Sequence, residues 1–310
     1  MREERVVVIG AGVGGLTAAA LLAAGGLDVT VLEKEADVGG KVRRVDVAGR
    51  AVDAGPTVFT MRRLFEELFD SCGANFADMV ETRPLRRLAR HAWPDGSRLD
   101  LYADSQRSRD AVGDFAGSAE AQAYAAFAAE SAAIWTTLED SFLMRQRCGP
   151  IGLTARLGLR RLPELQAVRP YESLWQALNG HFRDPRLVQL FGRYATYCGC
   201  SPFRAPATLM LIAHLESAGV WQVTGGLHRI AAALAMLAAR HGARIRTGTA
   251  ATAIRVRAGR VASVALADGT EIAADRVIAN CDPSALADGL FGPDVRLPGL
   301  PVGNLLANAA

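Results

Sequence analysis

The chain begins with a glycine-rich turn that constrains its fold more than any other feature. The segment VVVIGAGVGG starts within Arg5–Ile9, a short run of β-branched residues, and places Gly10, Gly12 and Gly15 in GxGxxG spacing. An alanine- and leucine-rich helical pattern follows, and Asp28–Leu32 has the composition of a second strand. A strand, a glycine turn, a helix and a second strand make the unit from which dinucleotide-binding parallel sheets are built. We therefore predict an α/β fold that opens with a Rossmann-like domain.

Each glycine of this turn has a separate task. Gly10 permits the tight turn after the strand, Gly12 lets the backbone approach a pyrophosphate, and Gly15 lets the helix and the strand pack closely. The helix N-terminus presents amide groups and a positive dipole end to the phosphates. That interaction contributes up to about 2 kcal/mol, so we expect it to position a cofactor more than to account for tight binding.

An acidic residue and a second glycine turn narrow the choice of cofactor. Glu33 ends the second expected strand, eighteen residues after Gly15. A carboxylate there can accept hydrogen bonds from both ribose hydroxyls, and its charge would repel a 2′-phosphate, which argues against NADP. Gly39, Gly40 and Lys41 follow shortly. A Gly-Gly-basic turn at this place is typical of flavoproteins related to amine oxidases rather than of plain NAD-dependent dehydrogenases.

Strand patterns gather at both ends of the chain, and helical patterns fill the middle. Alternating apolar residues and turn signals mark strands up to about residue 102 and again after residue 243, whereas helical periodicity dominates between them. We predict a discontinuous cofactor domain of residues 1–75 and 220–283, with an inserted, mainly helical domain over 76–219. Residues 284–310 would begin a further substrate-binding region.

Composition argues against several other classes of protein. The 310 residues carry a net charge of +3 with scattered basic residues, which is too little to indicate nucleic acid binding. Five cysteines without regular spacing indicate a reducing compartment, and Cys198 and Cys200 lack the partners that a zinc site needs. We expect no metal. We see no signal peptide, and no apolar run reaches the roughly 18 residues of a membrane span.

Longer motifs carry a resemblance to a known family. GxGxxG, Glu33, GGK and DAGPTVF occur together with RHAWPDGSRLDLYAD, ATYCGCSPFRAPATLMLIAHLE, GVWQVTGGLHRIAAALA and RVIANCDP. The set resembles the FAD-dependent carotenoid desaturases of the phytoene-desaturase type. It is most similar to the 1-hydroxycarotenoid 3,4-desaturases of photosynthetic bacteria, also called methoxyneurosporene or hydroxyneurosporene dehydrogenases. The similarity runs from Val6 to about Gly292, and it implies FAD as the cofactor.

The resemblance also implies a set of cofactor-binding residues besides the three glycines. Glu33 would bind the adenosine ribose, and Lys41 would lie along the FAD. Thr57 and Val58 would contact the cofactor from the Gly-Pro-Thr turn, which precedes an amphipathic helix expected to begin at Thr60.

Two further cofactor contacts come from the C-terminal half. Ala251 occupies the place where related enzymes have a valine whose backbone meets adenine. Asn280, in VIANCDP, would also face the cofactor.

The implied reaction is desaturation of an acyclic 1-hydroxy- or methoxy-carotenoid. One hydrogen would leave as hydride to the flavin and the other as a proton, with oxygen or a quinone as the final electron acceptor. The cofactor carries this chemistry and the protein supplies alignment. This agrees with a sequence in which we find no catalytic triad and assign no catalytic residue. Among the five histidines, His228 is the first that we would test.

A carotenoid needs a long apolar site and reaches the protein from lipid. Candidates for a tunnel in the inserted domain, which also fit ordinary core packing, are Phe127, Ile134, Trp135, Phe142, Leu209, Met210 and Ile212. Residues Leu143–Arg169 mix arginines with leucines and contain one acid, Glu164. Such a segment can lie on an anionic membrane surface or form a solvated basic face. We expect a cytoplasmic protein peripherally associated with the inner membrane.

Three interpretations remain open. The chain is a hydroxycarotenoid desaturase or its truncated copy, because desaturases of this type are longer and end in a glycine-rich flavin-binding segment. It could instead be another flavoenzyme of the same fold, such as an amine-oxidase-like oxidase or a carotenoid isomerase. The third interpretation is a non-catalytic lipid-binding relative on the same scaffold, like the GDP-dissociation inhibitors.

Overall fold

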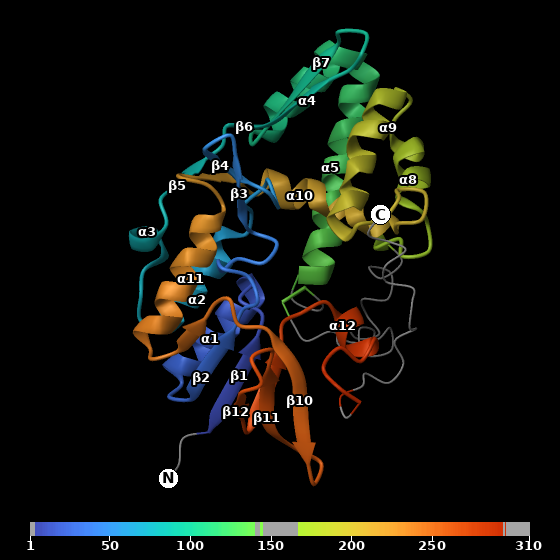
Figure 1. The fold of residues 1–310 in the computed structure, drawn as a ribbon. Coiled ribbons are helices and arrows are strands. Elements are labelled where there is room, and N and C mark those ends of the chain that lie inside the picture. Colours follow the sequence, from blue (N-terminus) through green and yellow to red (C-terminus); the bar gives the residue numbers. More distant parts are fainter. Residues whose placement is uncertain (1–3, 140–142, 145–166, 294, 296–310) are drawn as a thin grey trace. The chain divides into compact units, whose positions relative to one another are not determined.

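The computed structural model describes residues 4–139, 143–144, 167–293 and 295 (Figure 1). Contacts divide the chain into two units. Unit 1 is formed within residues 1–83 and 221–310, and unit 2 within residues 84–220. The first boundary lies later than the position 75/76 expected from sequence. The reason is that Phe76 and Val80 are buried in the core of unit 1.

A parallel sheet forms the centre of unit 1. Its strands are β1 (Arg5–Ile9), β2 (Asp28–Leu32), β9 (Arg244–Arg246) and β13 (Arg276–Ala279), in the order β13-β1-β2-β9. Val8 of β1 pairs with Ile278 on one side and with Val31 on the other. The predicted α/β fold with a Rossmann-like start is confirmed. The sheet joins the two ends of the described chain because β13 lies directly beside β1.

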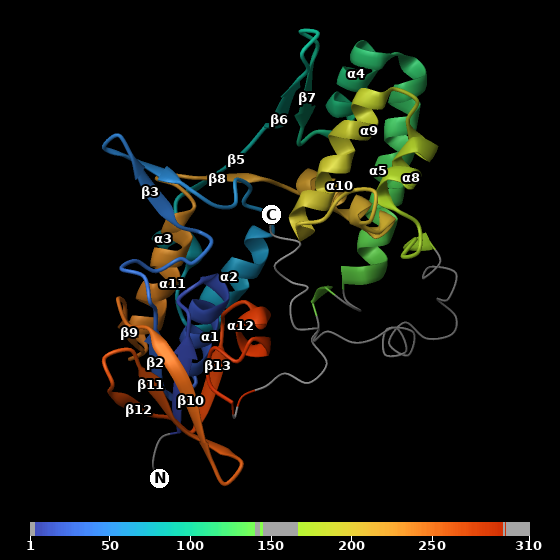
Figure 2. The ribbon, with the colours of Figure 1, turned by 45° about the vertical axis from the view of Figure 1, so that its right-hand side comes forward.

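Two helices pack together next to this sheet. They are α1 (Val13–Ala24) and α11 (His228–Arg240), which run side by side in both views (Figures 1 and 2). Small alanines of α1 and the apolar face of α11 share one core. This close packing carries the N-terminus of α11 into the region of the glycine turn.

Two more helices complete that core. These are α2 (Arg62–Ser71) and α3 (Phe76–Met79), with Phe69 fully buried against Phe76 at a ring-centroid distance of 5.2 Å. The helix expected from Thr60 begins two residues later. Met61 adopts a left-handed conformation with φ of 53°, which an α-helix does not accommodate.

The remaining strands of unit 1 form antiparallel pairs. A three-stranded sheet contains β10 (Ala251–Arg257), β11 (Arg260–Leu266) and β12 (Glu271–Ala273), and the short helix α12 (Pro283–Ala287) follows β13. A separate exposed hairpin joins β3 (Arg44–Val47) to β4 (Arg50–Asp53) through a turn at Gly49. The last pair is β5 (Thr82–Pro84) with β8 (Trp221–Val223).

Unit 2 is mainly helical, as the sequence predicts. One hairpin, β6 (Arg87–Ala92) and β7 (Arg98–Tyr102), turns at Pro94–Gly96. The helices are α4 (Ser105–Ala116), α5 (Ser118–Leu138), α8 (Leu174–His181), α9 (Pro185–Gly192) and α10 (Leu211–Ser217), with 3-10 turns η3 (Arg193–Cys198) and η4 (Ala207–Met210). The 3-10 turn η4 leads directly into α10. Phe127 packs edge-on against Phe182 and tilted against Phe191 in the core, and Phe182 stacks on Phe191.

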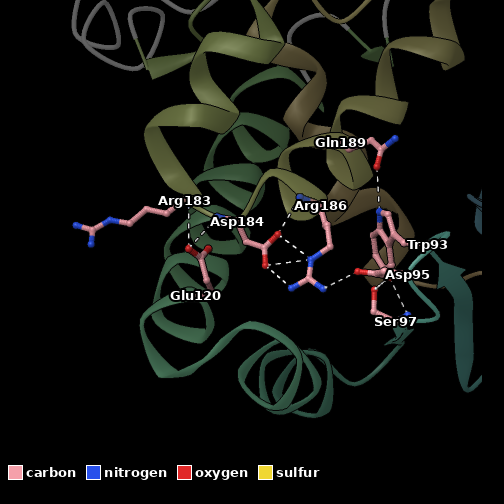
Figure 3. A network of polar contacts seen from close by, with 8 residues as sticks. All are labelled: Trp93, Asp95, Ser97, Glu120, Arg183, Asp184, Arg186 and Gln189. Atoms are coloured by element: carbon pink, nitrogen blue, oxygen red, sulfur yellow. Dashed lines mark hydrogen bonds and ion pairs between the residues drawn. The ribbon is translucent and has the colours of Figure 1, made fainter.

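A polar network fixes the start of α9 within unit 2 (Figure 3). The Asp184 carboxylate accepts from the Arg186 backbone N–H at 2.8 Å and pairs with the Arg186 guanidinium. Arg186 also pairs with Asp95 in the β6–β7 turn, and Glu120 of α5 accepts the backbone N–H groups of Arg183 and Asp184. These bonds tie the hairpin turn, α5 and α9 together, so the Pro-Asp-Gly turn has a structural role.

Candidate cofactor site

The glycine turn between β1 and α1 has the close packing that a phosphate cradle needs. Gly10 has a φ of 99°, and a Cβ on it would lie 2.5 Å from the Asn280 carbonyl oxygen. A Cβ on Gly15 would overlap the Gly10 carbonyl oxygen. Gly12 sits at the extended position before α1, and no side chain caps the first turn of that helix. The turn therefore excludes side chains and leaves its helix end open to an anionic group.

Asn280 supports this turn from the end of β13. Its backbone N–H donates to Ile9 O at 2.8 Å, and its Nδ2 donates to Gly10 O at 3.4 Å. A Cβ on Gly14 would lie 2.9 Å from Asn280 Oδ1, and one on Gly12 would lie 3.2 Å from Asn280 Nδ2. The structure thus places Asn280 against the glycine turn. Its direct contact with a cofactor stays a prediction.

Glu33 lies beside the same turn and is 6% exposed. Its Oε2 accepts from the Ala11 backbone N–H at 2.8 Å, and its Oε1 accepts from the Glu35 backbone N–H at 3.0 Å. A carboxylate has about four lone-pair sites, so the two bonds leave acceptor capacity for ribose hydroxyls. Glu33 therefore lies beside the glycine turn with acceptor capacity to spare, and its contact with a ribose stays a prediction.

The Gly39-Gly40 turn docks directly on the first glycine turn. The Gly39 backbone N–H donates to Ala11 O at 2.8 Å, and Gly12 and Gly39 form an isolated parallel bridge. A Cβ on Gly40 would lie 3.1 Å from Gly12 Cα. Lys41 follows with an exposed side chain. Two motifs that are separate in sequence thus form one continuous backbone surface.

The Gly-Pro-Thr turn lies next to Lys41. A Cβ on Gly55 would overlap the Lys41 carbonyl oxygen, so only glycine fits there. Phe59 is buried and accepts the Trp221 backbone N–H at 2.9 Å, which fixes the far end of the turn. Among the described residues none is hydrogen-bonded to Thr57, and Thr57 is exposed. Val58 is half-buried. Contact of Thr57 and Val58 with a cofactor stays a prediction.

Ala251 begins β10 and lies near Glu33 through the preceding loop. The Thr249 backbone N–H donates to Glu33 O at 2.7 Å, and the Gly248 backbone N–H donates to Glu35 O at 2.8 Å. Ala251 itself pairs with Leu266 and is half-buried. Unit 1 therefore contains every residue predicted to bind the cofactor, and the residues group around the glycine turn, the Glu33 carboxylate and the turn at Gly55.

Sequence reasoning missed Asp53, which contacts His228. Asp53 Oδ1 lies 3.1 Å from His228 Nδ1, and Oδ2 accepts the Leu227 backbone N–H at 2.7 Å. Burial of the carboxylate opposes ionisation, but the hydrogen bonds from Leu227 and His228 outweigh it and lower the pKa of Asp53. The sequence does show an acid just before the Gly55 turn and a histidine just after Gly225-Gly226. No spacing rule links two residues 175 positions apart.

The expected substrate tunnel is not supported by the described part of unit 2. Phe127, Ile134, Met210 and Ile212 are buried together in its core, and Trp135 and Leu209 pack against it. Pockets of about 510 Å³ and 270 Å³ in unit 2 are lined by other residues. Core packing therefore accounts for these side chains, while Phe142 lies outside the described residues.

The described residues contain neither a candidate metal cluster nor a helix that could span a membrane. No group of three or more His, Cys, Asp or Glu side chains that could hold a metal occurs among them. No described helix is both long and apolar enough to cross a membrane. The basic segment Leu143–Arg169 lies almost entirely outside the described residues.

Comparisons with known proteins give a consistent result. The family model "Flavin containing amine oxidoreductase" matches residues 13–307. The chain is 49% identical over 297 residues to the hydroxyneurosporene desaturase of Rubrivivax gelatinosus, covering 96% of this chain and 57% of that protein. Identity to the hydroxyneurosporene desaturase of Rhodobacter capsulatus is 44%, covering 96% and 60%. The chain thus spans about three fifths of the length of these relatives.

Solved structures show the same fold. An oxidoreductase from Methanosarcina mazei aligns with a TM-score of 0.62 and 18% identity, covering 98% of this chain and 64% of that one. A variant of putrescine oxidase redesigned in its cofactor binding aligns with a TM-score of 0.62 and 16% identity, covering 96% and 61%. At these identities the likeness concerns the fold alone.

Proposed function

Since the chain belongs to the family of flavin-containing amine oxidoreductases, we propose that it serves FAD-dependent desaturation of a carotenoid. The substrate that we propose is an acyclic 1-hydroxy- or methoxy-carotenoid. The observation that carries this proposal is the 49% identity to a hydroxyneurosporene desaturase over 96% of the chain. The cofactor is FAD, in agreement with the family and with the site described above.

We propose that residues of unit 1 bind the successive parts of FAD, from the adenosine ribose through the pyrophosphate toward the flavin. Glu33 would hold the ribose hydroxyls through its remaining acceptor sites. The glycine turn and the N-terminus of α1 would hold the pyrophosphate, because amide groups and the helix dipole favour an anion there. Lys41 and the Gly55–Val58 turn would lie farther along the cofactor.

The chemistry divides between the cofactor and the protein. When bound, the flavin ring supplies the acceptor for a hydride from the carotenoid. The protein's part is to align the cofactor and the substrate and to exclude water. We propose no catalytic side chain; the role that we propose for each predicted cofactor residue is binding or positioning.

Membrane contact and the electron acceptor belong to the same proposal. A carotenoid resides in lipid, and Leu143–Arg169 has the composition of a basic segment that lies on an anionic surface. We propose peripheral contact with the cytoplasmic side of the inner membrane. Oxygen or a quinone would reoxidise the flavin.

Pigment analysis tests the proposed reaction. The chain would be co-expressed in cells that accumulate a 1-hydroxylated, partly saturated acyclic carotenoid, and the extracted pigments would be measured by absorption and mass. Desaturation predicts a red-shifted spectrum and a mass lower by two hydrogens for each new double bond. An isomerase would leave the mass unchanged. A non-catalytic lipid carrier would purify without a flavin spectrum. Unchanged pigment mass or a missing flavin spectrum would each contradict the proposal.

A further inference from the structure

Asp53 joins two segments of unit 1 that both lie beside the predicted cofactor residues. It is the last residue of β4 and immediately precedes Ala54 and Gly55. Its two carboxylate oxygens contact the Leu227 backbone N–H at 2.7 Å and His228 Nδ1 at 3.1 Å. A hydrogen bond to an ionised acceptor is roughly twice as strong as one between neutral groups. The carboxylate therefore connects the Gly-Pro-Thr turn to the start of α11.

The backbone at Gly226 is shaped to admit this carboxylate. Gly226 has a φ of 98°, and a Cβ there would lie 2.7 Å and 2.9 Å from the two Asp53 oxygens. The same Cβ would lie 3.0 Å from His228 Nδ1. A glycine at this position thus satisfies a positive φ and a close approach at once.

Asp53 takes the place of a local helix cap. The residue at the N-cap position of α11 is Leu227, whose side chain has no acceptor, and the first turn contains no acid. A carboxylate at a helix N-terminus accepts an unpaired backbone N–H and interacts favourably with the positive dipole end. The cap of α11 therefore comes from β4, far away in sequence.

Contacts continue from this cap to the glycine turn. Gly55 lies against the Lys41 carbonyl oxygen, and Gly40 lies against Gly12. The start of α11 contacts the same turn, because a Cβ on Gly39 would lie 3.6 Å from Ala231 Cβ. The segments around Gly12, Gly40 and Gly55 thus lie against one another through backbone atoms, and α11 reaches them through the Ala231 side chain. Asp53 adds side-chain hydrogen bonds between the segment before Gly55 and the start of α11.

We propose that Asp53 is a positioning residue for FAD, acting through the Gly55–Val58 turn. By holding β4 to the start of α11, it would fix the Gly55–Val58 turn, whose Gly55 lies against the Lys41 carbonyl oxygen. This inference rests on the proposed function only in taking FAD as the ligand. It assigns Asp53 no contact with the carotenoid and no part in the proton or hydride transfer.

Flavin binding to the purified chain tests the proposal. FAD affinity would be measured from the quenching of flavin fluorescence, and visible circular dichroism would report the environment of the bound flavin. We expect Asp53→Ala to weaken FAD binding about tenfold, since both hydrogen bonds to a charged acceptor are lost. We also expect an altered visible dichroism. Asp53→Asn keeps an acceptor for the Leu227 N–H and should restore most of the affinity.

Asp46→Ala is the matched control. Asp46 lies in β3 of the same hairpin, where its Oδ1 accepts the Gly49 backbone N–H of the turn at 2.9 Å, and its loss removes the same charge. We expect wild-type affinity from this variant. Equal weakening by Asp46→Ala and Asp53→Ala would overturn the proposal, because it would indicate a general effect of charge or of hairpin stability.

Three other results of the FAD-binding experiment would also decide whether Asp53 positions FAD. Asp53→Ala with wild-type affinity and dichroism would overturn the role of Asp53 and leave the proposed function intact. A wild-type chain that binds no FAD would contradict both. If far-ultraviolet dichroism shows that Asp53→Ala does not fold, the comparison would use Asp53→Ser and Asp53→Asn. Equal affinities of those two folded variants and the wild type would overturn the proposal.

Discussion

Gly15 shows how little space one residue leaves at the cofactor site. A Cβ there would overlap the Gly10 carbonyl oxygen and lie 2.9 Å from Asn280 Nδ2. The nearest of these is a backbone atom of the glycine turn, so the turn itself would have to shift. The residue therefore determines the shape of the turn, and the spacing of GxGxxG predicted this from sequence alone.

Gly15→Ala tests that conclusion. We expect loss of FAD binding and destabilisation by about 1–3 kcal/mol, the usual cost of forcing an extra methyl group into a packed site. Flavin absorbance after gel filtration and thermal unfolding would measure the two effects. Gly180→Ala in α8 is the control, because a Cβ there meets nothing within 4 Å. Retention of wild-type flavin content by Gly15→Ala would contradict the account.

The ion pair on the β6–β7 hairpin predicts a dependence of stability on pH. The Arg90 guanidinium, which donates two hydrogen bonds of 2.8 Å, lowers the pKa of Asp100 to about 2. A carboxylate whose folded pKa is lowered stabilises the fold above its unfolded pKa of about 3.9. This contribution is lost as pH falls from about 4 to about 2.

Comparison with Asp100→Asn isolates the effect. We expect the difference in unfolding midpoint between wild type and Asp100→Asn to be constant above pH 5 and to shrink as pH falls toward 2. Denaturant unfolding followed by circular dichroism at each pH would measure it. A difference that stays the same from pH 5 to pH 2 would show that Asp100 is not responsible.

At the scale of elements, the bounds of the strands could be predicted from sequence, but which strands pair with each other could not. The bounds Arg5–Ile9 and Asp28–Leu32 follow from β-branched runs and agree with the structure. The pairing of β1 with β13 joins residues about 270 positions apart, and local pattern carries no information on it. The contact between Asp53 and His228 was missed for the same reason. Tunnel and core residues were indistinguishable because both are large and apolar.

Helix α2 anchors the Gly-Pro-Thr turn through its buried face. Phe69 is fully buried and packs edge-on against Phe76, and Phe59 at the end of the turn packs against Phe65 at 5.2 Å. We expect Phe69→Ala to destabilise unit 1 by about 3–5 kcal/mol. Thermal unfolding would measure it, with the exposed Leu21→Ala of α1 as the control. Equal unfolding midpoints for the two variants would contradict this description of the core.

At the scale of the whole molecule, the chain has two units and spans about three fifths of its relatives' length. Unit 1 contains every predicted cofactor residue, and unit 2 has its own aromatic core. The division into a strand-rich discontinuous part and a helical insertion was visible in the sequence, because the periodicity of apolar residues changes between them.

Membrane contact is a prediction at this scale. We expect the chain to sediment with anionic vesicles at low salt and to be released as salt rises, because charge attraction is screened within about 10 Å at 0.1 M salt. Replacing the arginines among Leu143–Arg169 by glutamine should reduce binding, whereas neutral vesicles should bind little. Unchanged binding after that replacement would contradict the electrostatic interpretation.

One measurement tests FAD-dependent desaturation by this chain most directly. The FAD-loaded protein would be mixed anaerobically with a 1-hydroxylated acyclic carotenoid. After a single turnover, the mass of the extracted pigment would be determined by mass spectrometry. We predict a product lighter by two hydrogens, formed in proportion to the flavin present. A product of unchanged mass, or one whose amount does not depend on the flavin, would contradict it.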